Sequence, residues 1–217
     1  MTRLALFDCD GTLVDGQAEV CEAMEIAFGS ANLAPPSRQL IRSIVGLSLP
    51  QAIFRLAPEA APKQHQDIIL AYKEAYRSKR ASGRLVEPLF VGIAELLNGL
   101  RGDGWYLGVA TGKSARGLDC CLKTHGLDQH FLTLQTADRH PSKPNPSMIR
   151  AALRDTRVKE PDAVMIGDTC FDIEMASNAG IRSIGVAWGY HDAAELRAAG
   201  ASAIAANADE LAYLLRA

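Results

Sequence analysis

The sequence predicts an α/β fold, namely a doubly wound parallel sheet core with an inserted all-helical cap lobe. Three observations support this prediction. Short apolar runs alternate with helical patterns over residues 85–217. Residues 15–84 contain helical patterns alone and come directly after the first apolar run. Acidic, hydroxyl and lysine residues follow several of the apolar runs, where parallel strands present their carboxyl ends to a ligand.

The first strand is expected at Leu4–Phe7, an apolar run that is followed by acidic residues and a glycine. Further apolar runs predict strands over residues 106–110, 163–166 and 183–186, with a weaker one over 203–205. Helical patterns separate these runs, over residues 92–100, 115–124, 146–154, 173–178 and 193–199. Residues 1–14 and 85–217 therefore form the predicted α/β core.

Residues 15–84 are expected to form the helical cap. Four consecutive helical patterns cover residues 19–28, 39–45, 51–56 and 64–79, and prolines at positions 35, 36, 50 and 58 separate them. Because no strand pattern interrupts these helices, the lobe is predicted to be an insertion after the first strand. It is expected to join the core near Gly16 and Gly83.

The composition argues against several classes of function. A formal net charge of −2 gives the molecule no overall positive potential that would attract nucleic acid or an anionic membrane. The five cysteines form no C-x-x-C pair, which argues against a zinc site or a disulfide framework and favours a reducing compartment. No apolar run reaches the length of a membrane span or of a signal-peptide core. These observations predict a cytoplasmic protein without nucleic-acid or membrane partners.

The first group of candidate site residues is Asp8-Cys9-Asp10-Gly11-Thr12. Residues two apart on an extended chain project to the same side, so the carboxylates of Asp8 and Asp10 are expected to face one cavity. Gly11 then allows a sharp turn. The alternative is a strand followed by an ordinary polar turn, in which Asp and Gly are common.

A second pair of carboxylates comes from Asp168 and Asp172, after the strand predicted over residues 163–166. Helix capping is the alternative explanation for both. If all four carboxylates converge, however, they need a counter-charge, because two unit charges about 4 Å apart repel by roughly 4 kcal/mol at an effective dielectric near 20. A divalent cation provides that charge, and an all-oxygen ligand set favours Mg²⁺.

Two further segments add a hydroxyl and an ammonium group. The run from Thr111 to Ser114 resembles the end of a phosphate-binding P-loop, but Leu107 stands where that pattern requires its first glycine. What remains of the pattern is a strand that ends in a hydroxyl residue at the N-terminus of a helix. The free N–H groups of that helix end can donate to an oxyanion. Lys143 lies in a proline-rich loop over residues 140–146, which holds the ammonium in place. For each segment alone, a plain helix cap or a solvated lysine is the alternative.

In this order, the motifs D-x-D-G-T, Thr, Lys and G-D-x-x-x-D resemble those of the haloacid dehalogenase superfamily of phosphohydrolases. The helical insertion is similar to that of the phosphoglycolate phosphatase and β-phosphoglucomutase subgroup. The resemblance covers essentially the whole chain, including Asp15 and the turn at residues 188–190. This chain departs from frequent residues of the family at Gly16 (serine), Val91 (proline) and Ser142 (glycine).

The resemblance implies catalytic roles for four residues. Asp8 would be the nucleophile that forms an aspartyl-phosphate, and Asp10 would protonate the leaving oxygen and then deprotonate water. Thr111 and Lys143 would hold the transferring phosphoryl oxygens.

The resemblance also implies a metal site and substrate contacts. Mg²⁺ would be bound by the carboxylates of Asp8 and Asp168 and by the backbone carbonyl of Asp10, with Asp172 acting through water or Lys143. The substrate contacts expected in addition are Thr12, Gly112 and Gly46, the last within the cap loop at residues 43–48. The cap would close over the site as a lid.

The implied function is hydrolysis of a small phosphorylated metabolite, similar to phosphoglycolate, by a monomer or homodimer. A sugar-phosphate mutase of the β-phosphoglucomutase type, a pyrophosphatase and a nucleotidase remain alternatives. A non-enzymatic receiver-like module is disfavoured, because receiver domains are shorter and lack the D-x-D-G-T order. The basic stretch Lys73–Arg84 is expected to be a solvated helix face, part of which could steer an acidic substrate. Cys9 and Cys170 are expected to be small buried hydrophobes, with oxidative inactivation as the alternative.

Overall fold

The computed structural model describes residues 2–216 and confirms the α/β fold. Within these residues, six parallel strands form one sheet in the order β3-β2-β1-β4-β5-β6. The strands are β1 (Leu4–Phe7), β2 (Tyr106–Thr111), β3 (Thr133–Thr136), β4 (Ala163–Gly167), β5 (Arg182–Val186) and β6 (Ala203–Ala205). The strand order reverses between β1 and β4, and a ligand crevice is expected beyond the carboxyl ends of these two strands.

Strand β1 lies at the centre of the sheet because both of its faces are apolar. Ala5 and Phe7 belong to one buried cluster, and Leu4 and Leu6 belong to another on the opposite face. The first cluster is covered by α5 (Ile93–Gly102), α6 (Ala115–Thr124) and α10 (Ala208–Arg216), and the second by α7 (Ser147–Thr156) and α8 (Cys170–Ala179). A short helix, α9 (Ala193–Ala198), packs beside β5 and β6.

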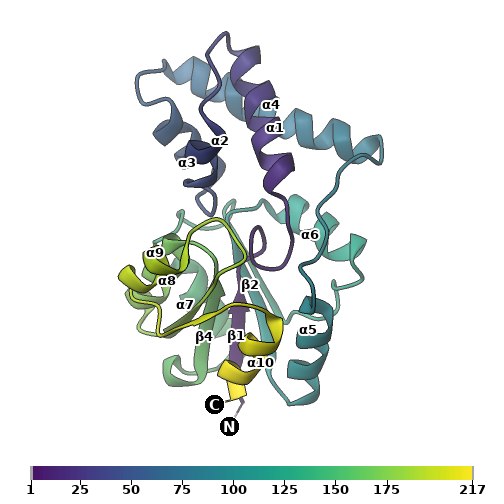
Figure 1. The fold of residues 1–217 in the computed structure, drawn as a ribbon, viewed down its shortest axis with the longest axis vertical. Coiled ribbons are helices and arrows are strands. Elements are labelled where there is room, and N and C mark those ends of the chain that lie inside the picture. Colours follow the sequence, from purple (N-terminus) through teal and green to yellow (C-terminus); the bar gives the residue numbers. More distant parts are fainter. Residues whose placement is uncertain (1, 217) are drawn as a thin grey trace.

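The inserted helices lie beyond the carboxyl ends of the strands, at the top of Figure 1. They are α1 (Gln17–Ser30), α2 (Arg38–Arg42), α3 (Leu49–Leu56) and α4 (Pro62–Ala81). They share a buried cluster of their own, which includes Met24, Phe28 and Ile53. The two linkers to the sheet pair with each other, since the Asp15 N–H donates to the Pro88 carbonyl over 2.8 Å. The exact division at residues 15–84 stays a prediction.

Two elements of the core were not predicted from the sequence patterns. Strand β3 has a single aliphatic residue, Leu134, and lies at the edge of the sheet. Two of its polar residues find their partner on α7, because Thr133 Oγ1 and Gln135 Nε2 each donate to Asp155 Oδ2 over 2.7 Å. Helix α10 follows an alanine-rich segment and was not predicted from the sequence.

Some predicted helix ends are also wrong. The helix expected over residues 39–45 ends at Arg42, because the following residues turn into the loop that faces the sheet. The helix expected from residue 173 begins at Cys170, where Thr169 and Asp172 form a capping box. Between residues 2 and 216 no helix combines the length and the apolar character that a membrane span requires.

Candidate active site

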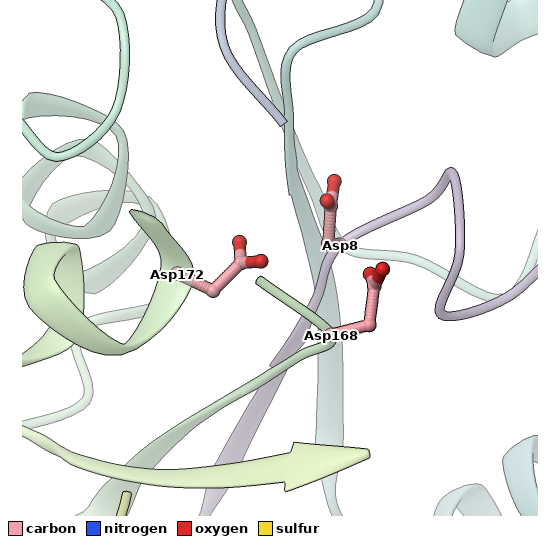
Figure 2. A group of neighbouring side chains, drawn as sticks. All are labelled: Asp8, Asp168 and Asp172. Carbon is pink, nitrogen blue, oxygen red and sulfur yellow. The ribbon is translucent and has the colours of Figure 1, made fainter. Parts of the chain in front are cut away.

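Three carboxylates converge beyond the carboxyl ends of β1 and β4 (Figure 2). Asp8 follows β1 directly, Asp168 follows β4, and Asp172 lies in the first turn of α8. One oxygen of each carboxylate lies within 4.8 Å of the others, and all three side chains are buried. The structure therefore brings together the acidic residues that the sequence places at two separate strand ends.

The ammonium of Lys143 reaches this cluster from the loop between β3 and α7. Its Nζ lies 3.0 Å from Asp8 Oδ1 and 2.6 Å from Asp172 Oδ1. The Lys143 side chain is fully buried, so it is not a solvated surface lysine. Burial disfavours its charged form, but the charges of Asp172 and Asp8 outweigh that effect and raise the pKa of Lys143 above its usual value.

The cluster carries more negative than positive charge, since three carboxylates face one ammonium. Burial raises the pKa of Asp8 to about 7 despite the lowering effect of Lys143. Burial and the neighbouring charges of Asp8 and Asp172 hold the pKa of Asp168 well above its usual range. Among residues 2–216, the Oδ2 atom of Asp8 has no hydrogen-bond partner although it is buried. A buried set of oxygen donors that carries excess negative charge fits a divalent cation.

Asp172 and Thr12 hold the cluster in place. Asp172 Oδ2 accepts from the Thr169 N–H over 3.1 Å and from Thr169 Oγ1 over 2.7 Å, while its Oδ1 accepts from Lys143. Asp172 therefore caps α8 and orients Lys143 at the same time. Thr12 Oγ1 donates to Asp168 Oδ1 over 2.7 Å and is fully buried, so Thr12 helps to orient the cluster, and its expected contact with substrate stays a prediction.

Asp10 lines the same cavity as Asp8, but its carboxylate has a different partner. Lys113 Nζ lies 2.5 Å from Asp10 Oδ1 and 2.8 Å from Glu87 Oε1. Burial alone would lower the pKa of Lys113, but these two carboxylates hold it well above its usual value. No role for Lys113 or Glu87 is predicted from the sequence patterns. Lys113 lies two residues after Thr111, so its proximity to the site could be inferred. Nothing in the sequence around Glu87 indicates that it lies near the site.

A cavity of about 410 Å³ opens between the sheet and the helical lobe. Its core side includes Asp8, Asp10, Thr111 and Gly112, and its lobe side includes the loop at residues 44–50. The two sides touch, because a Cβ atom on Gly112 would lie 2.8 Å from the Gly46 carbonyl oxygen. The loop is also tied to the core by the Ser48 N–H, which donates to Ser142 Oγ over 2.8 Å.

Three basic side chains of α4 line this cavity: Lys73, Arg77 and Arg80. Their spacing of four and three residues places them on one face of the helix. The first two are exposed, as expected for a solvated basic face, but the face is turned toward the cavity. Lys79 points away from it and pairs with Glu19 over 2.6 Å.

The two cysteines beside the acidic residues differ in exposure. Cys9 is fully buried with its sulfur 4.0 Å from that of Cys121, and this contact together with burial holds the pKa of the Cys9 thiol well above its usual value. Burial also raises the pKa of the partly exposed Cys170. Both shifts disfavour the reactive thiolate form. Cys9 matches the expected small buried hydrophobe, whereas Cys170 does not, because it is partly exposed.

Comparison with known proteins places the fold and site in a family. Residues 5–186 match the family of haloacid dehalogenase-like hydrolases. The chain is 33% identical over 203 residues to "Probable phosphatase IndB" of Dickeya dadantii, which covers 92% of this chain and 87% of the relative. It is 27% identical over 214 residues to the phosphoglycolate phosphatase of Vibrio parahaemolyticus, with 96% and 94% covered. The crystal structure of a predicted phosphatase from Clostridium acetobutylicum matches with a TM-score of 0.88 and 26% identity, covering 100% of this chain and 99% of the other.

The family match begins in β1 and ends with β5, so it spans the acidic cluster, Lys143 and the helical lobe. The expected enzyme class, a phosphoric monoester hydrolase, agrees with the phosphatase names of the relatives. The resemblance inferred from the motifs is thus confirmed, and the chain belongs to the haloacid dehalogenase-like hydrolase family of enzymes.

Proposed function

We propose that the chain is a Mg²⁺-dependent phosphatase that hydrolyses a small phosphate monoester, similar to phosphoglycolate, through an aspartyl-phosphate on Asp8. The observation that carries this proposal is Asp8 Oδ2, a buried carboxylate oxygen in the cavity wall to which residues 2–216 supply no hydrogen-bond partner. Lys143 holds the other oxygen, Oδ1, at 3.0 Å. A fixed carboxylate with one free oxygen beside an ammonium suits nucleophilic attack on phosphorus.

The reaction takes two displacements. In the first, Asp8 Oδ2 attacks phosphorus, the bond from phosphorus to the leaving oxygen breaks, and Asp10 gives that oxygen a proton. In the second, Asp10 takes a proton from water as the water oxygen attacks phosphorus, which releases Asp8 and inorganic phosphate. Lys143 and Thr111 hold the phosphoryl oxygens in both steps. Mg²⁺, held by Asp8, Asp168 and the Asp10 carbonyl, would supply the positive charge that the carboxylates and phosphate need.

The helical lobe excludes water during the first displacement. Gly112 allows the lobe loop to approach the end of β2, and Gly46 allows it to approach Thr169 after β4, where a Cβ would lie 2.9 Å from Thr169 Oγ1. Ser48 is hydrogen-bonded to Ser142 across the same junction. Such closure keeps water away from the phosphoryl group until Asp8 has displaced the leaving group. Gly46 and Gly112 therefore act mainly by allowing these contacts.

The charge of the cavity supports a leaving group that carries its own anion. Lys73, Arg80 and Arg116 line the cavity, and within residues 2–216 none of the three forms an ion pair. Phosphoglycolate is small and has a carboxylate near its phosphate, so it fits both the volume and the charge. The name of the relative from Vibrio parahaemolyticus adds support for this substrate class.

The alternatives share the chemistry but place different demands on the cavity. A sugar-phosphate mutase needs hydrogen-bonding groups for several hydroxyls, whereas the lobe loop contributes the apolar residues Ile44, Val45 and Leu47. A pyrophosphatase would use the same basic side chains of the cavity as a phosphoglycolate phosphatase. A nucleotidase would have to accommodate a nucleoside within about 410 Å³.

The test is phosphate release from a panel of esters, measured with Mg²⁺ and with EDTA, and with Asp8→Asn as the blank. The panel contains phosphoglycolate, pyrophosphate, a sugar phosphate and a nucleoside monophosphate. The proposal expects Mg²⁺-dependent release, fastest from phosphoglycolate, and none from the blank. Release that persists in EDTA or in the Asp8→Asn blank would contradict it, and interconversion of sugar-phosphate isomers without release would favour the mutase.

A further inference from the structure

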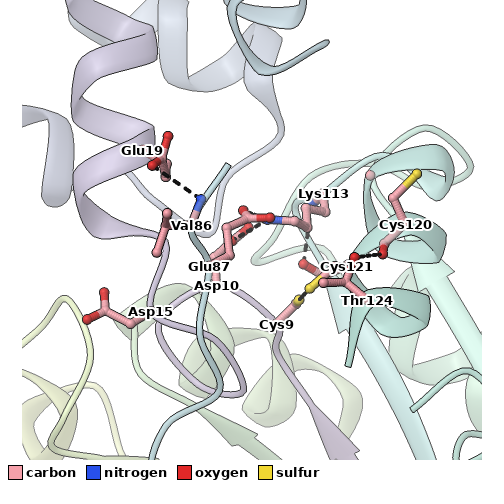
Figure 3. A network of polar contacts seen from close by, with 12 residues as sticks. Cys9, Asp10, Asp15, Glu19, Val86, Glu87, Lys113, Cys120, Cys121 and Thr124 are labelled. Carbon is pink, nitrogen blue, oxygen red and sulfur yellow. Dashed lines mark hydrogen bonds and ion pairs between the residues drawn. The ribbon is translucent and has the colours of Figure 1, made fainter. Parts of the chain in front are cut away.

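The carboxylate of Asp10 is held by one residue that the reaction described above does not use. Lys113 Nζ contacts Asp10 Oδ1 at 2.5 Å, and both side chains are largely removed from solvent, with exposed fractions of 11% for Lys113 and 15% for Asp10. The contact goes through Oδ1, which leaves Oδ2 as the oxygen for proton exchange in the cavity. Figure 3 shows Lys113 pointing at Asp10 and Glu87 from the end of the neighbouring strand.

The second partner of Lys113 lies in the linker that returns from the helical lobe. Glu87 Oε1 accepts from Lys113 Nζ over 2.8 Å, and the Glu87 side chain is only 6% exposed. The outgoing linker is close too, because a Cβ atom on Gly16 would lie 3.3 Å from Asp10 Oδ1 and 3.4 Å from Glu87 Oε1. A larger residue at position 16 would therefore press on both carboxylates.

The lobe itself also contacts this network. Lys113 Nζ lies 5.9 Å from the ring centre of Tyr76 on α4, and Tyr76 packs against Tyr72 at a ring separation of 5.1 Å. A single ammonium thus pairs with the loop after β1 and with the returning linker, and it lies near an aromatic ring of a cap helix. Two of its three N–H donors are engaged by carboxylates, so its position is defined by protein groups rather than by a substrate.

We propose that Lys113 is a positioning residue that fixes the Asp10 carboxylate for proton transfer and, through Glu87, couples its alignment to the seating of the helical lobe. The proposal rests on the proposed function, in which Asp10 protonates the leaving oxygen. When the lobe is seated, Glu87 and Asp10 hold Lys113 between them, and the free oxygen of Asp10 faces the cavity. When the linker shifts, Lys113 loses one of its two anchors and Asp10 loses its fixed orientation.

The test compares two esters of nearly the same shape, phenyl phosphate and 4-nitrophenyl phosphate. Phenol is a poor leaving group that needs protonation, whereas 4-nitrophenolate leaves without it. Lys113→Met is expected to lower kcat/KM for phenyl phosphate by about 100-fold, the range of a general acid's contribution, and for 4-nitrophenyl phosphate by far less. The quantity kcat/KM is used because it reports the steps up to the first bond cleavage.

Lys123→Met is the matched control, since it removes a solvent-exposed lysine of α6 whose ion-pair partner within residues 2–216 is Asp119. It is expected to leave both esters unchanged. Because Lys113→Met leaves two carboxylates facing each other, Glu87→Gln serves as a second variant that keeps the Lys113–Asp10 pair. Its expected effect is a smaller loss, about tenfold, again confined to phenyl phosphate.

Three results would overturn the proposal: equal losses for both esters in folded Lys113→Met, an increase in KM alone, or a Glu87→Gln enzyme with wild-type rates on both esters. The first would make Lys113 purely structural, the second would make it a substrate ligand, and the third would remove the coupling to the linker. Failure of the proposed function would look different, because the wild-type enzyme with Mg²⁺ would then release phosphate from neither aryl ester nor from phosphoglycolate.

Discussion

Lys143 donates a hydrogen bond to Asp172 Oδ1 over 2.6 Å, and both side chains are completely buried. The same ammonium lies 3.0 Å from Asp8, so Asp172 sets the place from which Lys143 acts on the proposed nucleophile. A buried cation among three carboxylates serves catalysis and stability together. Its removal should therefore affect both.

Lys143→Met is expected to abolish most of the activity and to lower the free energy of unfolding by about 3–5 kcal/mol, because it leaves buried carboxylates without their cation. Phosphate release and thermal unfolding measure the two effects. Lys123→Met, at an exposed ion pair, is the control and should change neither. An inactive Lys143→Met enzyme with wild-type stability would contradict the balance of charges described for the cluster.

Added Mg²⁺ is expected to stabilise the protein more at pH 8 than at pH 5. In the metal-free protein, burial raises the pKa of Asp8 from 3.8 to about 7. A carboxyl group whose pKa is raised by folding contributes stability that is fully present below its unfolded pKa and is lost as the pH rises through its folded pKa. The metal-free protein therefore loses this contribution between about pH 4 and pH 7, and a bound cation offsets the loss.

Thermal unfolding with Mg²⁺ and with EDTA at the two pH values measures this effect. Asp8→Asn serves as the control, because it removes the titrating group, and its gain from Mg²⁺ should be smaller and less dependent on pH. The same increase in Tm at both pH values for the wild-type protein would contradict the prediction.

Gly112→Ala is expected to reduce kcat/KM by about 100-fold while the protein stays folded. The added Cβ would lie 2.7 Å from the Leu47 carbonyl oxygen and 2.8 Å from that of Gly46, so the lobe loop would have to move away from the strand end. A misplacement of about 1 Å near a reacting group can cost that much. Gly102→Ala is the control, since a Cβ there meets open space. Equal activity of the two variants would show that the contact at Gly112 does not matter for the reaction.

The sequence places Asp8 and Asp168 at neighbouring strand ends because that information is local. Asp8 and Asp168 each follow a short apolar run, and parallel strands bring such positions to one edge of the sheet. Lys143 is different: its loop has no periodicity, and only the resemblance to a known family gave it a role. The structure then shows why it can act, since Asp172 lies within 2.6 Å of its ammonium.

The part of the site that was missed depends on contacts between distant segments. Glu87 lies in a linker without strand or helix pattern, and nothing in its surroundings indicates that it meets Lys113 at 2.8 Å. Strand β3 was missed for a related reason, because Thr133 and Gln135 are polar and gain their partner only from Asp155 on another element. Propensity and periodicity describe single segments, whereas these residues are explained by tertiary pairing.

The most direct test of the central claim is to look for the phosphoryl group on Asp8. The wild-type enzyme is quenched in acid during steady-state turnover of the best ester with Mg²⁺, and the peptide that contains Asp8 is analysed by mass spectrometry. We expect a phosphorylated peptide with the modification at Asp8, and none in the Asp8→Asn protein, which should also be inactive. Turnover without any label on Asp8, together with an Asp8→Asn enzyme whose rate stays within about tenfold of wild type, would contradict the mechanism.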